Sequence, residues 1–177
     1  MLKHAKIFLI ILVVALGSCA KRTPLEQARD MREEREKIER ESAFPDMSFE
    51  SQSPKRKASI QLTQEGFRES SGGYYVRAIK KYEQAIDLDP SNPYAYFHFG
   101  VARYGMKEYD QSLRMLDEAR GKFGDNERWL SKIFTYQGLN YRALGRLDKA
   151  KEALTKALEL DSRNELARQG LAEMGEQ

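Results

Sequence analysis

The organisation of this 177-residue chain is decided by a motif that occurs twice: IDLDPSN at residues 86–92 and LELDSRN at residues 158–164. Small residues around the motif recur at the same two intervals. Glycine stands at positions 66, 100 and 138, so the intervals are 34 and 38 residues. Repeats of this length are typical of solenoids, in which each unit stacks on its neighbours. The pattern predicts three repeated units between residues 59 and 164.

The recurring small residues have a physical explanation in helix packing. Two helices approach closely only where a side chain is small, and bulky neighbours then fill the space. A glycine inside a helix costs up to ~1 kcal/mol relative to alanine, so three matched glycines need such a reason. We expect the whole frame to lie between paired helices; its members are Gly66, Ala78, Ala85, Gly100, Ser112, Ala119, Gly138, Ala150 and Ala157.

This frame resembles the tetratricopeptide repeat (TPR) family, whose unit is a 34-residue antiparallel helix pair. With the glycines at the family's small position 8, its bulky position 24 is Tyr82, Leu116 and Leu154. The resemblance implies an all-α fold, a short TPR solenoid of three helix pairs at about 59–92, 93–130 and 131–164. Residues 165–177 are predicted to form a capping helix over the open end.

Four additional residues separate the second unit from the third, around residues 121–129. Four residues are about one helical turn. If Asp125 or Asn126 caps the next helix, that helix begins one turn early. Trp129 then lies on the extra turn, either as a packing residue at the junction or as a partly exposed anchor for a partner.

Residues 1–18 have the zones of an export signal: a basic head, ten apolar residues from Ile7 to Leu16, and then Gly17-Ser18 before Cys19. Ten apolar residues are too few to span a bilayer, which needs about 20, and they fit a signal peptide. Residues 16–19 also resemble the lipobox of bacterial lipoproteins, in which the cysteine is acylated. We therefore expect lipidation at Cys19, the alternative being an ordinary signal peptide that contains a cysteine. The predicted location is exported and lipid-anchored to a bacterial membrane, with the outer membrane favoured because Ala20 is not an aspartate.

Residues 19–58 are predicted to be a lipidated N-terminus, a charged helical stalk and a linker. The stalk, at about residues 23–42, carries several opposite-charge pairs four residues apart, each worth roughly 0.2–0.5 kcal/mol. Its apolar positions are sparse, which favours a solvated helix over the alternative of a short coiled coil or partner-docking helix. Prolines, serines and a basic cluster in residues 43–58 are typical of a linker.

Composition argues against several function classes. Without Lys3 and Lys6 of the predicted leader, the chain has 28 basic and 27 acidic side chains. This near balance gives no excess of positive charge that would favour binding to nucleic acid. A single cysteine excludes an intramolecular disulfide, and only two histidines accompany it, so a His/Cys metal cluster is not expected. No phosphate-binding loop or nucleophile elbow occurs. We expect no cofactor, no metal and no enzymatic activity.

The family resemblance also implies where a partner binds. TPR domains bind on the concave face lined by the first helix of each pair, and the matching positions give a partner groove of Phe67, Tyr94, Phe97, Val101, Tyr104, Lys132, Leu139 and Arg142. Aromatic rings would anchor an extended peptide or a helix, and Arg142 or Lys132 would orient a carboxylate. The alternative is that the stalk or the final helix covers some of these side chains. His98 is expected to be a packing or groove-side residue rather than a catalyst.

The function predicted from these features is an interaction scaffold or assembly factor of the bacterial envelope, resembling TPR lipoproteins such as pilotins. Its partner would be an envelope protein or peptide segment, and the membrane would be reached through Cys19. The alternative is a carrier of a small apolar ligand held in the groove. The oligomeric state is not predicted.

Overall fold

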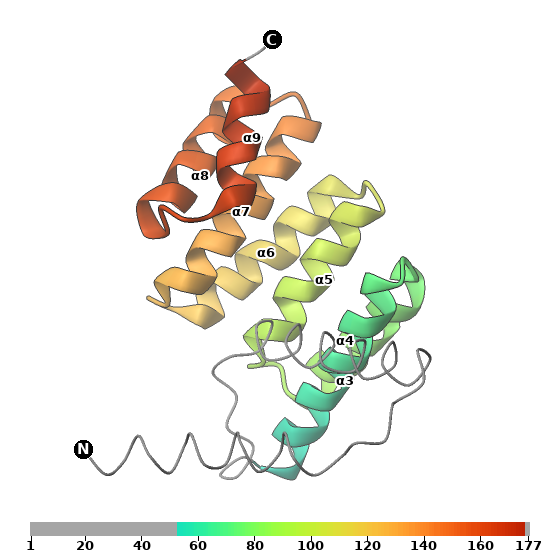
Figure 1. Cartoon of the computed structure of the whole chain (residues 1–177). Coiled ribbons are helices and arrows are strands. Elements are labelled where there is room, and N and C mark those ends of the chain that lie inside the picture. The colour runs from blue at the N-terminus through green and yellow to red at the C-terminus, as the bar shows by residue number, and fades with distance from the viewer. Residues whose placement is uncertain (1–52, 176–177) are drawn as a thin grey trace, which may run out of the picture. The chain divides into compact units, whose positions relative to one another are not determined.

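The computed structural model describes residues 53–175, which form seven α-helices and contain no strand (Figure 1). The helices are α3 (Pro54–Ser71), α4 (Tyr75–Leu88), α5 (Pro93–Gly105), α6 (Tyr109–Phe123), α7 (Glu127–Ala143), α8 (Leu147–Leu160) and α9 (Glu165–Gly175). Consecutive helices pair as α3/α4, α5/α6 and α7/α8, and the pairs stack in chain order. The predicted all-α solenoid of three pairs and a last helix is confirmed. The predicted lipidation site Cys19, the predicted signal peptide and the predicted stalk lie outside the described residues.

The first helix of each pair begins with a capping side chain. Ser53, Asn92 and Asn126 accept hydrogen bonds of 3.1–3.3 Å from backbone amides of the first turn of α3, α5 and α7. Pro54 and Pro93 follow the first two caps, where a missing N–H is tolerated. Consequently α3 starts five residues before the predicted repeat boundary at residue 59. Because Asn126 caps α7, this helix starts one turn early, as the four additional residues predict.

A left-handed residue lies in the turn inside each pair. Gly73, Lys107 and Gly145 have φ values of 80°, 63° and 70° at equivalent positions of the three units. Glycine adopts this conformation without a steric penalty, whereas an L-residue with a Cβ pays roughly 1–2 kcal/mol. The middle unit therefore carries local strain that the other two avoid.

Replacing Lys107 with glycine is expected to raise the free energy of unfolding by up to about 1 kcal/mol, since the steric penalty exceeds the added chain entropy. Urea unfolding followed by circular dichroism measures the change. The matched control is Lys80→Gly at an exposed position inside α4, which should cost about 1 kcal/mol. A loss of stability in both variants would contradict the argument.

The recurring small residues lie where the two helices of a pair approach each other closely. A Cβ added to Gly66 would lie 2.5 Å from the ring of Tyr82, and one added to Gly138 would lie 2.6 Å from Leu154 Cγ. Gly100 faces Leu116 in the same way. The other members of the frame are fully buried: Ala78, Ala85, Ser112, Ala119, Ala150 and Ala157.

A buried polar network joins the ends of the first unit. Ser59 Oγ donates a hydrogen bond of 2.7 Å to the carbonyl of Ala85, and Asn92 Nδ2 donates to Ser59 Oγ at 2.9 Å and to Thr63 Oγ1 at 3.1 Å. The third unit repeats the arrangement with Ser131, Ala157, Asn164 and Thr135. Burial without such partners would be costly, so these residues fix the register between consecutive units.

The middle unit replaces this network with aromatic rings. Pro93 and Phe97 stand where the other units have serine and threonine. Trp129, fully buried on the extra turn of α7, stacks on Phe123 with ring centres 4.7 Å apart, and the rings of Tyr94 and Phe97 meet it edge-on at 5.1 and 5.2 Å. We call these four residues the Trp129 cluster. Trp129 is thus a packing residue at the junction and not an exposed anchor.

Helix α9 continues one layer of the stack. Successive contacts join α3, α5, α7 and α9, which we call the inner layer, while α4, α6 and α8 form the outer layer. Ala167 is fully buried, and a Cβ on Gly170 would lie 3.0 Å from Leu154 Cδ1, so α9 packs closely on α8. Within residues 53–175 none of the helices combines the length and hydropathy needed to cross a bilayer.

Candidate functional site

A row of aromatic rings crosses three helices of the inner layer. The distances between the centres of neighbouring rings along the row are 5.1, 5.1, 5.8 and 5.9 Å, and the interplanar angles lie between 64° and 79°. Such edge-on pairs are favourable by about 0.5–1.5 kcal/mol beyond their buried area. We call this set the inner aromatic row, and its members in order are Phe67 of α3, His98 and Phe97 of α5, Tyr136 of α7 and Tyr104 of α5.

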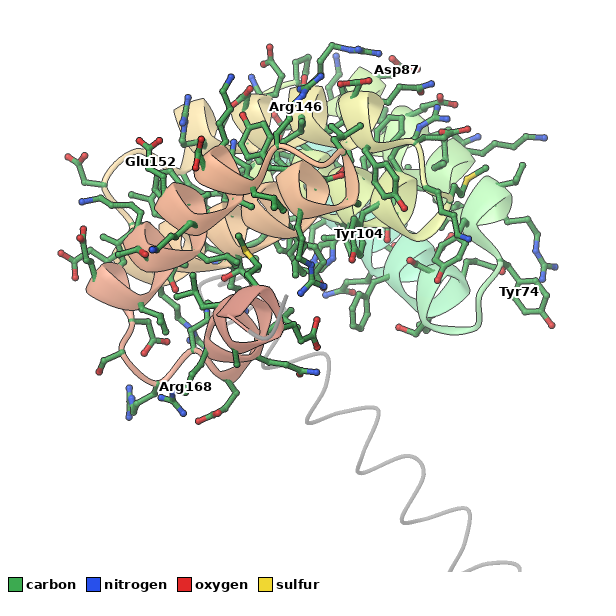
Figure 2. All side chains as sticks on the ribbon, turned by 90° about the horizontal axis from the view of Figure 1, so that it is seen from above. Tyr74, Asp87, Tyr104, Arg146, Glu152 and Arg168 are labelled. Atoms are coloured by element: carbon green, nitrogen blue, oxygen red, sulfur yellow. The ribbon has the colours of Figure 1, made fainter. Side chains whose placement is uncertain are left out.

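The members of the row differ in exposure. Phe97 and His98 are 5% and 6% exposed, whereas Phe67, Tyr104 and Tyr136 are half-buried. The two buried rings therefore support three rings that reach the surface. Figure 2 shows Tyr104 near the middle of the molecule, among side chains of neighbouring helices, whereas Tyr74 points outward at one end.

The structure sorts the predicted groove residues into different environments. Phe67, Phe97 and Tyr104 belong to the inner aromatic row, and Val101 of α5 is half-buried. Tyr94 does not join the row, because among the described residues its ring contacts are with Phe123 and Trp129 and with none of the half-buried rings of the row. Only part of the predicted set therefore forms one surface.

Three further predicted residues belong to α7, and two of them, Leu139 and Arg142, lie next to α9. Lys132 Nζ is 4.3 Å from the centre of the Trp129 ring, a cation–π distance. Arg142 forms an ion pair with Glu173 of α9. Leu139 is 6% exposed and lies close to Gly170 of α9. The final helix thus covers this end of the predicted groove, which is the alternative that the sequence left open.

Tyr136 belongs to the site but is absent from the predicted set. Burial raises the pKa of its phenol, in keeping with a ring packed between Phe97 and Tyr104. The sequence does contain a pattern that predicts Tyr136 as a groove residue. One helix face has the spacing i, i+4, i+7, which is the spacing of Lys132, Tyr136 and Leu139. Extending the predicted positions by this rule would have found it.

His98 is held in its neutral form. Burial, and secondarily the positive charge of Lys132, lower its pKa from 6.5 to about 3. Its ring lies against Phe67, Phe97 and, at 6.3 Å between centres, Tyr82. A histidine that stays neutral among aromatic rings acts as a packing residue.

This shift predicts a pH dependence of stability. His98 takes up a proton near pH 6.5 in the unfolded chain but only near pH 3 in the folded chain. The part of the unfolding free energy that depends on neutral His98 is therefore present above pH 6.5 and is lost as the pH falls towards 3. The loss from pH 7.5 to 5 is expected to be about 2 kcal/mol. Urea unfolding at several pH values measures it, with His98→Leu as the comparison. The pKa values of Glu65 and Asp89 are lowered from 4.5 and 3.8, so both carboxyls titrate below this window. An equally steep loss in His98→Leu would contradict the assignment.

A hollow of about 860 Å³ lies elsewhere, between α6, α7 and α8. Residues of both charges line it, among them Asp117, Arg120, Lys149 and Glu152. Gln137 donates a hydrogen bond of 2.8 Å to Asp117 in its wall. A surface of this composition is not suited to a small apolar ligand. The predicted alternative places such a ligand in the groove and not in this hollow, so it stays an untested prediction.

Comparison with known proteins identifies the repeats. Residues 70–107 match a family model described as TPR repeat, and residues 131–164 match one described as tetratricopeptide repeat. The small glutamine-rich tetratricopeptide repeat-containing protein 2 of Mycosarcoma maydis is 30% identical over 120 residues, which are 66% of this chain and 32% of that protein. Its namesake in Saccharomyces cerevisiae is 29% identical over 103 residues, 58% of this chain and 29% of that protein. The chain therefore contains TPR repeats, and the matches span about a third of the length of these two relatives.

Solved structures share the fold. The first TPR domain of Spaghetti (RPAP3), bound to the HSP90 peptide SRMEEVD, superposes with a TM-score of 0.62 at 23% identity, covering 68% of this chain and 93% of that one.

The comparisons contradict the predicted location. Both sequence relatives are eukaryotic proteins, from cells without a bacterial outer membrane, and neither is described as exported or lipidated. The prediction of an exported protein anchored in a bacterial envelope is therefore wrong. The resemblance to pilotins gains no support, and lipidation of Cys19 stays an untested prediction.

Proposed function

We propose that this stack of TPR repeats is a protein-interaction module that holds a segment of another protein on its inner aromatic row. The observation that carries the proposal is the row itself. Phe67, Tyr104 and Tyr136 reach the surface and rest on the buried rings of Phe97 and His98. Rigid aromatic side chains set in a packed surface are the residues that most often dominate the energy of protein binding.

The proposed ligand differs from the chaperone peptide bound to the Spaghetti domain. Resemblance to chaperone-binding TPR domains implies lysine and asparagine at two positions of the first unit, which here are Thr63 and Phe67. Of the residues that this resemblance implies, only Lys132 of the third unit matches. Thr63 is fully buried and accepts a hydrogen bond from Asn92. These two positions cannot supply the charged and amide contacts to a terminal carboxylate, so we propose a segment anchored mainly by apolar and aromatic contacts.

Binding, and not catalysis, is the proposed activity. His98 is the residue in the row with a side chain suited to general acid–base chemistry, and a pKa of about 3 leaves it unable to carry a proton near neutral pH.

Tyr104→Ala tests the proposal. Peptides selected for binding to the full chain from a random displayed library are expected to bind this variant at least about 10-fold more weakly, because one of the three surface rings, at one end of the row, is removed. Fluorescence anisotropy gives the dissociation constants. Tyr74→Ala is the matched control, since Tyr74 is an exposed tyrosine of the α3–α4 turn. Equal affinity of both variants and the wild type would refute the proposed site.

A further inference from the structure

We infer that the guanidinium of Arg142 is a carboxylate-binding subsite at one end of the inner aromatic row, which Glu173 of α9 fills in the free chain and an acidic side chain of the partner takes over. This inference rests on the proposed function and names the chemistry of the bound segment: apolar residues for the row and a glutamate or aspartate for Arg142.

The subsite is built on α7 and reaches α9. Arg142 Nη1 donates to the carboxylate of Glu173 and, at 3.3 Å, to the carbonyl of Gly170. Its side chain keeps 27% of its surface exposed, so the guanidinium is accessible while its position is fixed. Arginine binds carboxylates with directed hydrogen bonds, and here one such complex is already formed.

Tyr104 connects this subsite to the aromatic row. Burial raises the pKa of its phenol, and the charges of Arg142 and Glu173 act on the same phenol with opposite signs. Tyr104 also lies beside Tyr136 of α7, with ring centres 5.9 Å apart, and Arg142 follows Tyr136 by six residues on that helix, about 9 Å along its axis. A partner segment resting on Tyr104 would bring its next side chains to Arg142.

Glu173 is suited to displacement because other contacts also hold α9. The helix is held by Ala167, which is fully buried, and by Gly170, which packs between Leu154 and Leu139. Glu173 is 46% exposed in its side chain and also accepts a hydrogen bond of 2.9 Å from Gln169 on its own helix. Exposed ion pairs contribute little to stability, so an incoming carboxylate meets a weak competitor.

Charge on the proposed contact surface favours an acidic partner. The positions predicted for contact include two cations and no acid: Arg142, and Lys132, which lies on the ring of Trp129 that contacts Phe97 of the row. The carboxylate that reaches Arg142 comes from α9, outside the three helices that form the row. An acidic segment would complement this surface, whereas a basic one would meet like charges.

The test uses the full chain and a 12-residue amidated peptide of four Glu-Leu-Ala repeats, with a Gln-Leu-Ala peptide for comparison. Glu173→Gln is expected to bind the acidic peptide roughly 2- to 5-fold more tightly than the wild type, since it removes the internal competitor. Arg142→Gln should bind it more weakly and lose the preference for glutamate over glutamine. The matched controls are Glu165→Gln and Arg168→Gln, which break another ion pair of α9, with the same changes in charge, and should leave affinity unchanged.

Two results would overturn the inference. The first is equal binding of the acidic peptide by the wild type, Glu173→Gln and Arg142→Gln, which would place the carboxylate elsewhere. The second is failure of the acidic peptide to bind Glu173→Gln at all, with the NMR signal of the Arg142 Nε–H unmoved. Neither result would contradict the proposed function, which is tested independently. It is contradicted if Tyr104→Ala binds the selected peptides with the affinity of the wild type. Thermal unfolding by circular dichroism confirms that each variant is folded.

Discussion

Trp129→Ala is expected to lower the free energy of unfolding by about 3–5 kcal/mol, the usual cost of deleting a large buried aromatic side chain. The indole is fully buried between the second and third units and contacts Phe123, Tyr94 and Phe97. Among the described residues its Nε1 has no hydrogen-bond partner, so the loss comes from ring packing and from the cation–π contact with Lys132. The effect should be large because the middle unit lacks the Ser–Thr–Asn network that fixes the other two.

Urea unfolding measures this loss, and two variants calibrate it. Trp129→Phe keeps a ring in the cluster and should lose less than half as much. Tyr74→Ala removes an aromatic ring that is 57% exposed and should change stability by less than about 1 kcal/mol. A loss below about 1 kcal/mol in Trp129→Ala would mean that the cluster does not hold the units together.

The helix pairs were predictable because their signal is local and repeated. Gly66, Gly100 and Gly138 each face a bulky side chain of the paired helix, so a single steric rule acts three times, at intervals of 34 and 38 residues. The early start of α7 was predictable from the length of the second unit. Its four additional residues supply one helical turn, which follows the Asn126 cap at the start of α7. In both cases the determining residues are close in sequence.

The site was less predictable because it depends on contacts between distant residues. The sequence could place Tyr94 on an inner position but could not show that Trp129, 35 residues later, would bury it. The ion pair of Arg142 joins residues 31 apart and depends on how α9 docks, which is set by Ala167 and Gly170. The repeat frame thus defines which face is available, and the packing between units decides which side chains remain on it.

Gly138→Ala is expected to destabilise the chain by about 1–3 kcal/mol, although alanine is the better helix former. The added Cβ would lie 2.6 Å from Leu154 Cγ, 2.9 Å from its Cδ2 and 3.2 Å from the carbonyl of Ala150. Leu154 is fully buried and also contacts α9 through Gly170, so it has no space into which it can withdraw. Relief would require α7 and α8 to move apart.

Gly121→Ala is the matched substitution, because Gly121 lies inside α6 and a Cβ there would meet nothing within 4 Å. With no steric cost, the gain in helix propensity should stabilise the chain by up to about 1 kcal/mol. The two variants make the same chemical change inside neighbouring helices, and opposite signs of the change in unfolding free energy would isolate the helix–helix contact as the cause. Stabilisation by both would show that the recurring glycines do not mark close packing, and the physical explanation of the repeat frame would fail with them.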